Sequence, residues 1–312
     1  MTVLQLAVKI VLFIAVGVVA RKLKVMADGF DKLLSRFVMA IPLPCMIINS
    51  FRIEFSVEEL RGVPVLLGLS LLSMAVVGVA AQLVFIRMQR TPVARSVRFA
   101  LLFTNFMFFG LPVVNELYGA QGSFYYLIFT LPIRVMFYGG APITVGGVEQ
   151  RMSARELLKK LLCEPVVAVF IGLFLYVTQI RLPAILDSVL TTLGSMASPL
   201  GLMLCGAIIA DAQWKGILKY PCIIWVTAAR LCLIPAAVMG LFLLLGVDHG
   251  IIRAAVCCFA MPVASLLPTF YLRYDPGETE GRLAGGYMVV ASTLFCVATI
   301  PLWAVVMDKI LS

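Results

Sequence analysis

The chain has 312 residues, of which 62% are hydrophobic and 13% are charged, and its mean hydropathy is +1.05. Soluble domains carry roughly 25% charged residues, so this composition excludes a soluble globular domain and indicates a protein that lies mostly in lipid. The formal net charge of +9 does not indicate nucleic-acid binding, because the basic residues follow the loops between hydrophobic segments.

Hydrophobic segments recur along the chain with the length that a membrane-spanning helix needs, about 20 residues. The connections between them are short and leave no room for a soluble domain, so the sequence predicts a single membrane domain. The predicted spans are residues 3–20, 33–51, 63–86, 99–117, 123–147, 161–178, 188–210, 217–246, 250–272 and 285–307.

The basic residues are distributed unequally between the two sets of loops that these spans define. Seventeen of the 25 Lys and Arg residues lie on one predicted side and five on the other, while Lys9, Arg134 and Arg230 lie inside spans. Basic loops stay in the cytoplasm, so both termini are predicted on the periplasmic face of a bacterial inner membrane.

The second half of the chain resembles the first at proline-containing elements. Residues 39–43 (Met-Ala-Ile-Pro-Leu) resemble residues 196–200 (Met-Ala-Ser-Pro-Leu), and residues 111–113 resemble residues 261–263. By the loop count, the corresponding spans run in opposite directions. The sequence therefore predicts an inverted repeat, which is common in secondary transporters. Residues 1–148 and 161–312 would form the two repeats, and residues 149–160 a cytoplasmic linker.

Prolines predict that spans 4 and 9 are interrupted near the middle of the membrane. A proline inside a helix removes one hydrogen bond and clashes with the preceding turn, so Gly110-Leu111-Pro112 and Pro262 are expected to break their helices. In lipid, broken helices survive only where protein or a watery cavity surrounds them. Helices that restart at these prolines would present free N–H groups at residues 113–115 and 263–265, which attract anions. A proline kink without a ligand is the alternative.

The order of several short motifs resembles the auxin efflux carrier family in its short bacterial form, over nearly the whole chain. The motifs are Leu43-Pro44 followed by Asn49-Ser50-Phe51, Thr104-Asn105-Phe106 followed by Gly110-Leu111-Pro112 and Gly119, Pro199 to Gly206-Ala207, Arg230-Leu231 to Pro235, and Ser292-Thr293 to Pro301-Leu302. The resemblance implies an all-α polytopic membrane protein with ten helices in a five-plus-five inverted repeat, similar to bile-acid symporters and sodium/proton antiporters. It also implies that helices 4 and 9 are broken and cross, that one domain moves like an elevator, and that the substrates are organic anions.

Arg134 is a candidate for substrate binding. It falls near the middle of span 5, where an arginine costs about 2.5–3.5 kcal/mol on insertion scales, and no acidic residue lies nearby in that span. A carboxylate substrate would supply the missing charge, because a guanidinium binds a carboxylate in a bidentate fashion. A structural pair with Glu116 or with a backbone carbonyl is the alternative. Arg230 and Lys9 are interpreted as structural.

Asn105 is the best polar candidate, because a buried amide must be hydrogen-bonded and can face a ligand. Glu116 is a candidate for ion coupling, with a position at the rim as the alternative. One histidine and no CxxC motif predict no metal site, and no cofactor is expected. The predicted substrate contacts are Asn105, Gly110, Pro112, Val113, Asn115, Arg134, Pro262, Val263 and Ser265.

These patterns predict a secondary carrier of a small organic anion and not an enzyme, and the family resemblance implies a carboxylate similar to malate, malonate or auxin. Its partners would be the organic anion, the lipid bilayer and a second copy in a homodimer, with no nucleic acid. One alternative is a sodium-coupled, bile-acid-like symporter, which would place polar residues at both helix breaks. The other is an intramembrane enzyme, which would need a nucleophile or an acid/base pair in one cavity.

Overall fold

The computed structural model describes residues 3–27, 29–146, 155–156, 162–210, 214–217 and 219–311, and over these residues the regular elements are helices. In chain order they are α1 (Val3–Lys22), α2 (Phe30–Ala40), α3 (Pro42–Ser50), α4 (Val57–Arg87), α5 (Pro92–Leu102), the π-helical turn η1 (Phe106–Gly110), α6 (Leu111–Gly146), α8 (Glu164–Thr178), α9 (Ala184–Ser195), α10 (Ala197–Ala210), α11 (Trp214–Ile217), α12 (Cys222–Ala228), the π-helical turn η3 (Ala229–Leu233), α13 (Ile234–Leu244), α14 (His249–Ala260), α15 (Leu267–Tyr274) and α16 (Thr279–Ile310).

Six helical stretches within the described residues are long and apolar enough to cross a membrane. They are Lys32–Ser50, Val57–Arg87, Phe106–Gly146, Ala184–Ala210, Cys222–Leu244 and Thr279–Ile310, and α8 and α14 are shorter apolar helices. The fold is therefore that of an all-α polytopic membrane protein. The ten-span inverted repeat stays a prediction, and most of the predicted linker at 149–160 lies outside the described residues.

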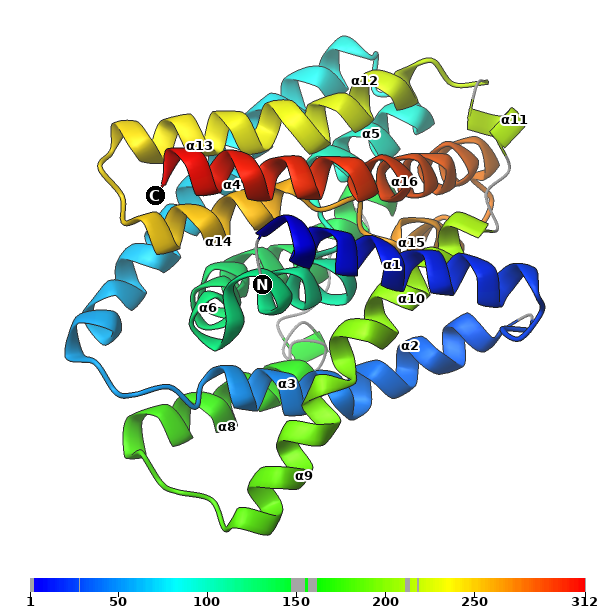
Figure 1. Ribbon diagram of the computed structural model, residues 1–312. Coiled ribbons are helices and arrows are strands. Elements are labelled where there is room, and N and C mark those ends of the chain that lie inside the picture. The colour runs from blue at the N-terminus through cyan, green and yellow to red at the C-terminus, as the bar shows by residue number, and fades with distance from the viewer. Residues whose placement is uncertain are drawn as a thin grey trace.

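The helices form two groups that meet along the middle of the molecule. In Figure 1, α12, α13 and α16 lie in the upper part and α2, α3, α8 and α9 in the lower part, with α1, α6 and α10 between them. α3 packs against both α8 and α9, and α1 packs along α10. A Cβ atom at Gly17 would collide with the Met203 backbone in α10, and one at Gly206 with the Ile14 carbonyl in α1. Glycine at these two positions lets the two helices approach this closely.

The matching proline-containing elements of spans 2 and 7 both lie at a helix boundary. α2 ends at Ala40, and Ile41 has φ −127° and ψ −70° before Pro42 opens α3. α9 ends at Ser195, and α10 begins at Ala197, two residues before Pro199. Proline is favoured in the first turn of a helix, where its missing N–H has no partner in any case. Each span is thus built from two consecutive helices.

The first predicted interruption lies at a different place from the one that the sequence indicated. The chain is non-helical at residues 103–105, not at Gly110-Leu111-Pro112, and η1 runs directly into α6. The amides of Phe109 and Gly110 both donate to the Asn105 carbonyl, at 3.3 and 3.0 Å. A π-helical turn shifts the hydrogen-bond pattern by one residue. The helix can therefore continue through Pro112, which has no N–H group to donate.

Residues 113–115 consequently lie inside α6, and the prediction that their amides are free is wrong. The boundary between spans 4 and 5 is Gly119, whose φ of 63° and ψ of −154° interrupt α6. Such a positive φ is readily adopted only by glycine. The second predicted interruption does contain its proline, because Met261 ends α14 and α15 begins only at Leu267.

Candidate functional site

The two interrupted segments, residues 103–105 and 261–266, pair with each other, and together they are called the crossover here. Thr104 and Val263 form an antiparallel bridge. The Asn105 amide donates to the Pro262 carbonyl at 2.8 Å, and the Ala264 amide donates to the Phe103 carbonyl at 3.1 Å. Backbone that leaves a helix inside a membrane needs such partners. The crossover thus satisfies much of its own backbone.

Both helices that leave the crossover begin beside one small cavity. In η1 the first amide with a helical partner is that of Phe109, so the N–H groups of Phe106, Met107 and Phe108 form the open end of the helix. α15 begins at Leu267 without a side-chain cap, but the Leu267 amide donates to the Ala264 carbonyl at 3.2 Å and Pro268 has no N–H, so η1 supplies most of the open amides. Helix N-termini carry partial positive charge and favour anions. The crossover cavity, of about 40 Å³, is lined by Met39, Thr104, Asn105, Phe106, Met107, Phe108, Phe137, Tyr138, Ala264, Ser265 and Leu266.

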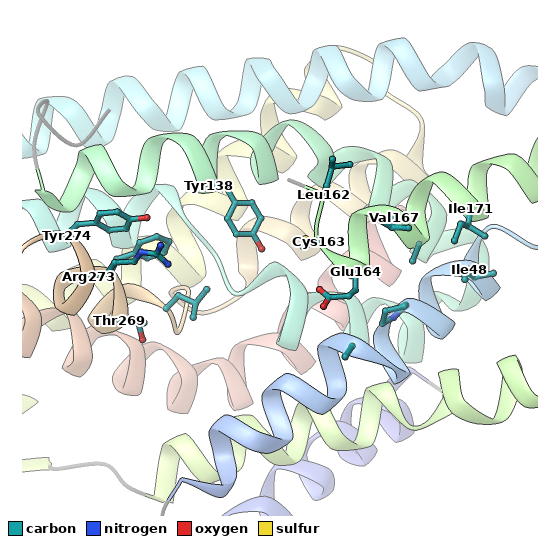
Figure 2. A pocket seen from close by; sticks show the side chains of 15 residues that line it. Ile48, Tyr138, Leu162, Cys163, Glu164, Val167, Ile171, Thr269, Arg273 and Tyr274 are labelled. Atoms are coloured by element: carbon teal, nitrogen blue, oxygen red, sulfur yellow. The ribbon is translucent and has the colours of Figure 1, made fainter. Parts of the chain in front are cut away.

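A second and larger cavity, the entry cavity, adjoins the first and has a volume of about 810 Å³. Tyr138 and Leu266 line both cavities. Figure 2 shows Arg273 and Tyr274 on one side of the entry cavity and Glu164 on the other, with the ring of Tyr138 between them. The walls therefore come from helices that are far apart in the sequence, since Glu164 opens α8 and Arg273 belongs to α15.

Arg134 lies in α6 and is 2% exposed; it contacts two residues that line the crossover cavity but does not line the cavity itself. Its Nη2 donates to the sulfur of Met107 at 3.1 Å, and its guanidinium carbon lies 5.6 Å from the centre of the Phe106 ring. Nε and Nη1 have no hydrogen-bond partner within the described residues. The proposed structural partner Glu116 instead pairs with Lys9 at 2.6 Å. A buried cation without a counter-ion is costly, so such a group favours a negatively charged ligand.

The structure brings some of the predicted contacts together. Asn105 and Ser265 line the crossover cavity, whereas Pro262 and Val263 supply backbone partners to the crossover itself. The Val263 amide is also bound, because it donates to the Ser292 hydroxyl at 3.0 Å. Of the three amides predicted to be free at residues 263–265, those of Val263 and Ala264 are therefore already hydrogen-bonded within the protein.

The other predicted contacts in span 4 have different surroundings. A Cβ atom at Gly110 would collide with the Tyr126 hydroxyl, and Val113 is fully buried. The Pro112 carbonyl accepts a hydrogen bond from Ser198 at 3.4 Å. Asn115 lines a separate cavity of about 200 Å³ together with Asn49, Thr191 and other residues. These four positions do not line the crossover cavity.

Several residues of the two cavities escaped the sequence analysis. The sequence does not indicate the open amides of residues 106–108, because Gly110-Leu111-Pro112 predicts a helix break after these residues. Tyr138 and Glu164 were missed because their position in a cavity depends on how α6, α8 and α15 pack. One signal was available, since Tyr138 follows Arg134 by four residues and shares its helix face.

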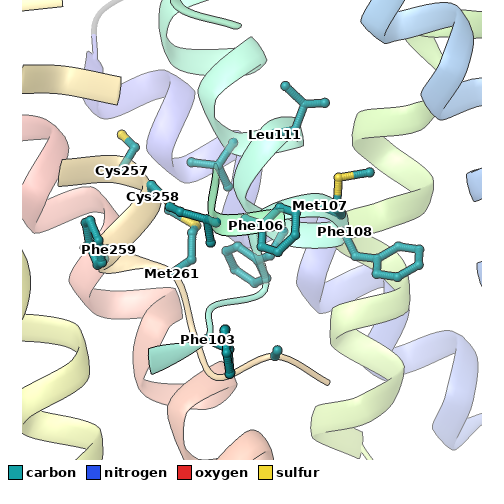
Figure 3. Packing of buried hydrophobic residues seen from close by; sticks show 14 of the residues in the cluster. Phe103, Phe106, Met107, Phe108, Leu111, Cys257, Cys258, Phe259 and Met261 are labelled. Carbon is teal, nitrogen blue, oxygen red and sulfur yellow. The ribbon is translucent and has the colours of Figure 1, made fainter. Parts of the chain in front are cut away.

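The packing around the crossover is aromatic and sulfur-rich. Figure 3 shows Phe106, Met107 and Phe108 of η1 near Phe259 and Met261 at the end of α14. Within the described residues, no group of three or more His, Cys, Asp or Glu side chains is arranged to hold a metal ion. All eight cysteines are free thiols, and most of them are buried. The chemistry available at the site is thus polar recognition by amides and one guanidinium.

Interrupted helices that meet beside a cavity are a feature that many membrane transporters share. A search of curated proteins finds no match to this sequence. The sequence matches the membrane transport protein family over residues 2–140 and 149–304. The chain therefore belongs to this family, which includes the auxin efflux carriers.

Proposed function

We propose that this membrane transporter is a secondary carrier of a small organic anion that bears a carboxylate. The observation that carries the proposal is the buried, unpaired guanidinium of Arg134. It contacts Phe106 and Met107, whose amides belong to the open end of η1. Two sources of positive potential therefore converge, and a carboxylate can accept hydrogen bonds from both.

The two cavities supply a route to this site. The crossover cavity of about 40 Å³ has room for a few water molecules but not for an organic acid. Substrate would therefore enter the larger cavity first and displace Met107, a side chain with three flexible bonds. By the distribution of basic loops, the entry cavity faces the cytoplasm of a bacterium, because residues 147–160 lie on the basic side.

An elevator-type movement is supported by how the helices are tied together. Arg95 of α5 donates to the Val145 carbonyl near the end of α6 and pairs with Asp275 and Glu278, which follow α15. These links join the helices of the crossover into one body. The entry cavity separates that body from α3 and α8. Movement of one body along the other would close this cavity and open the opposite side.

Transport into proteoliposomes tests the proposed function. Purified protein is reconstituted, and uptake of labelled malonate, malate and indole-acetate is measured with and without imposed pH and sodium gradients. We expect at least one of these acids to accumulate above the level in protein-free liposomes. Equal uptake of all three with and without protein would contradict the proposal, and a sodium requirement would favour the symporter alternative.

Glu116 is proposed as the group that couples transport to protons. Its carboxylate is mostly buried and pairs with Lys9 of α1 at 2.6 Å, so this charge links α1 to α6. We expect Glu116→Gln to transport substrate with little response to an imposed pH gradient. Glu59→Gln is the matched control, because Glu59 is bound by Gln121 and Tyr125 and lies away from α1. An unchanged pH response in Glu116→Gln would remove Glu116 from the coupling step.

A further inference from the structure

Arg230 links the two helices that enter the crossover. Its Nη1 donates to the Leu101 carbonyl at 2.9 Å, and its Nε donates to the Met261 carbonyl at 3.3 Å. Leu101 lies in the last turn of α5, and Met261 directly follows α14. The last carbonyl groups of a helix have no partner within the helix and carry partial negative charge. One guanidinium thus binds a carbonyl in the last turn of α5 and the first carbonyl of the interrupted segment 261–266.

The position of Arg230 depends on a local irregularity of its own helix. It lies in η3, a π-helical turn between α12 and α13, and is fully buried. The Leu231 carbonyl in this turn accepts a hydrogen bond from the Trp303 indole at 2.7 Å. The guanidinium carbon also lies 5.7 Å from the centre of the Phe259 ring in α14. The side chain is therefore held from two directions, by α5 and by α14 with Met261, while its Nη2 has no hydrogen-bond partner within the described residues.

Arg230 and the crossover cavity lie at opposite ends of the same backbone segments. The chain passes from Leu101 through residues 103–105 to the open amides of η1, and from Met261 to the start of α15. A shift of the Leu101 or Met261 carbonyl would therefore be passed over a few residues to the backbone that borders the crossover cavity. Arg230 itself does not line that cavity.

We propose that Arg230 is a positioning residue for the anion site, which holds the crossover in register so that the open amides of η1 face the ligand. The effect of Arg230 on transport rests on the proposed function, whereas its effect on the backbone of the crossover does not. Arg230→Met removes both hydrogen bonds, whereas Arg230→Lys keeps the charge but cannot reproduce the spacing of Nε and Nη1.

Hydrogen exchange tests the backbone part of this proposal in the full-length protein without substrate. The amides of Asn105 and Ala264, which bond across the crossover, should exchange faster in Arg230→Met and to an intermediate degree in Arg230→Lys. The matched control is Arg253→Met, because Arg253 also donates to a carbonyl, that of Leu311, away from the crossover. Exchange at both amides that equals the wild-type rate in both Arg230 variants would overturn the proposal.

Transport kinetics test its consequence with the labelled acid that the wild-type protein accumulates. We expect the KM for uptake to rise about tenfold in Arg230→Met, with partial recovery in Arg230→Lys, because supporting residues fix the geometry of the groups that bind. A general loss of folded protein would lower the maximal rate in both variants without this order in KM. Wild-type KM values in both variants would overturn the positioning role even though the protein transports. Absence of uptake by the wild-type protein would refute the proposed function instead, and the hydrogen-exchange result would still decide the role of Arg230.

Discussion

Replacement of Arg134 by glutamine is expected to raise the KM for uptake of the anion by about tenfold to a hundredfold. Hydrogen bonds to charged groups contribute about 1.5–3 kcal/mol each, and the glutamine amide supplies no charge. The guanidinium has two nitrogen atoms without a partner in the described structure, so a carboxylate that reaches it would be bound by groups that nothing else uses. Uptake by proteoliposomes at graded substrate concentrations measures this effect.

The folded state should survive this change, because Arg134 makes one weak hydrogen bond to a sulfur atom and no ion pair within the described residues. Arg134→Lys should recover part of the affinity, since it restores the charge without the bidentate geometry. Arg253→Gln is the control for loss of an arginine elsewhere in the protein. A KM equal to the wild-type value in Arg134→Gln would remove Arg134 from the substrate site.

Gly206→Val is expected to destabilise the protein by about 3 kcal/mol, near the upper end of the usual cost of overpacking. A Cβ atom at this position overlaps the Ile14 carbonyl of α1, which is backbone and cannot rotate away. The spacing of α1 and α10 is equally close at Gly17, where a Cβ atom would overlap the Met203 backbone. The loss of folded protein in detergent after heating, followed by size-exclusion chromatography, measures the change.

Gly240→Ala provides the comparison, because a Cβ atom at Gly240 in α13 has no neighbour within 4 Å. Alanine is the better helix former by about 1 kcal/mol, so this variant should be as stable as the wild-type protein or slightly more so. Similar thermal stability in Gly206→Val and Gly240→Ala would show that α1 and α10 do not depend on this close contact.

The membrane class of the protein and its family could be predicted from the sequence because they depend on patterns that many residues share. Apolar segments of spanning length and an excess of basic residues in alternate loops remain visible despite errors at single positions. The family match agrees with the motifs that include Asn105 and Arg230. The two helices that end at the crossover, α5 and α14, have 11 and 12 residues, which is too short to span a membrane alone.

The crossover itself was predicted less well, because proline indicates where a helix is irregular but not how the chain responds. At Pro262 the helix ends, whereas at Pro112 the preceding turn becomes π-helical and the helix continues. The break near Asn105 is instead set by pairing with residues that lie about 160 positions later, which no local pattern records. The sequence shows that Arg134 has no acidic neighbour in its own span, but whether another span pairs with it, and its contacts with Met107 and Phe106, depend on tertiary packing.

The narrowness of the crossover cavity also bears on energy conservation by the cell. Protons and small ions cross a membrane quickly along continuous files of water. The cavity beside Asn105 has room for only a few water molecules and is bordered by Phe106, Met107 and Phe108. Among the described residues, a transporter built this way thus leaves little space at the crossover for a file of water, which would limit leakage of ions when no substrate is bound.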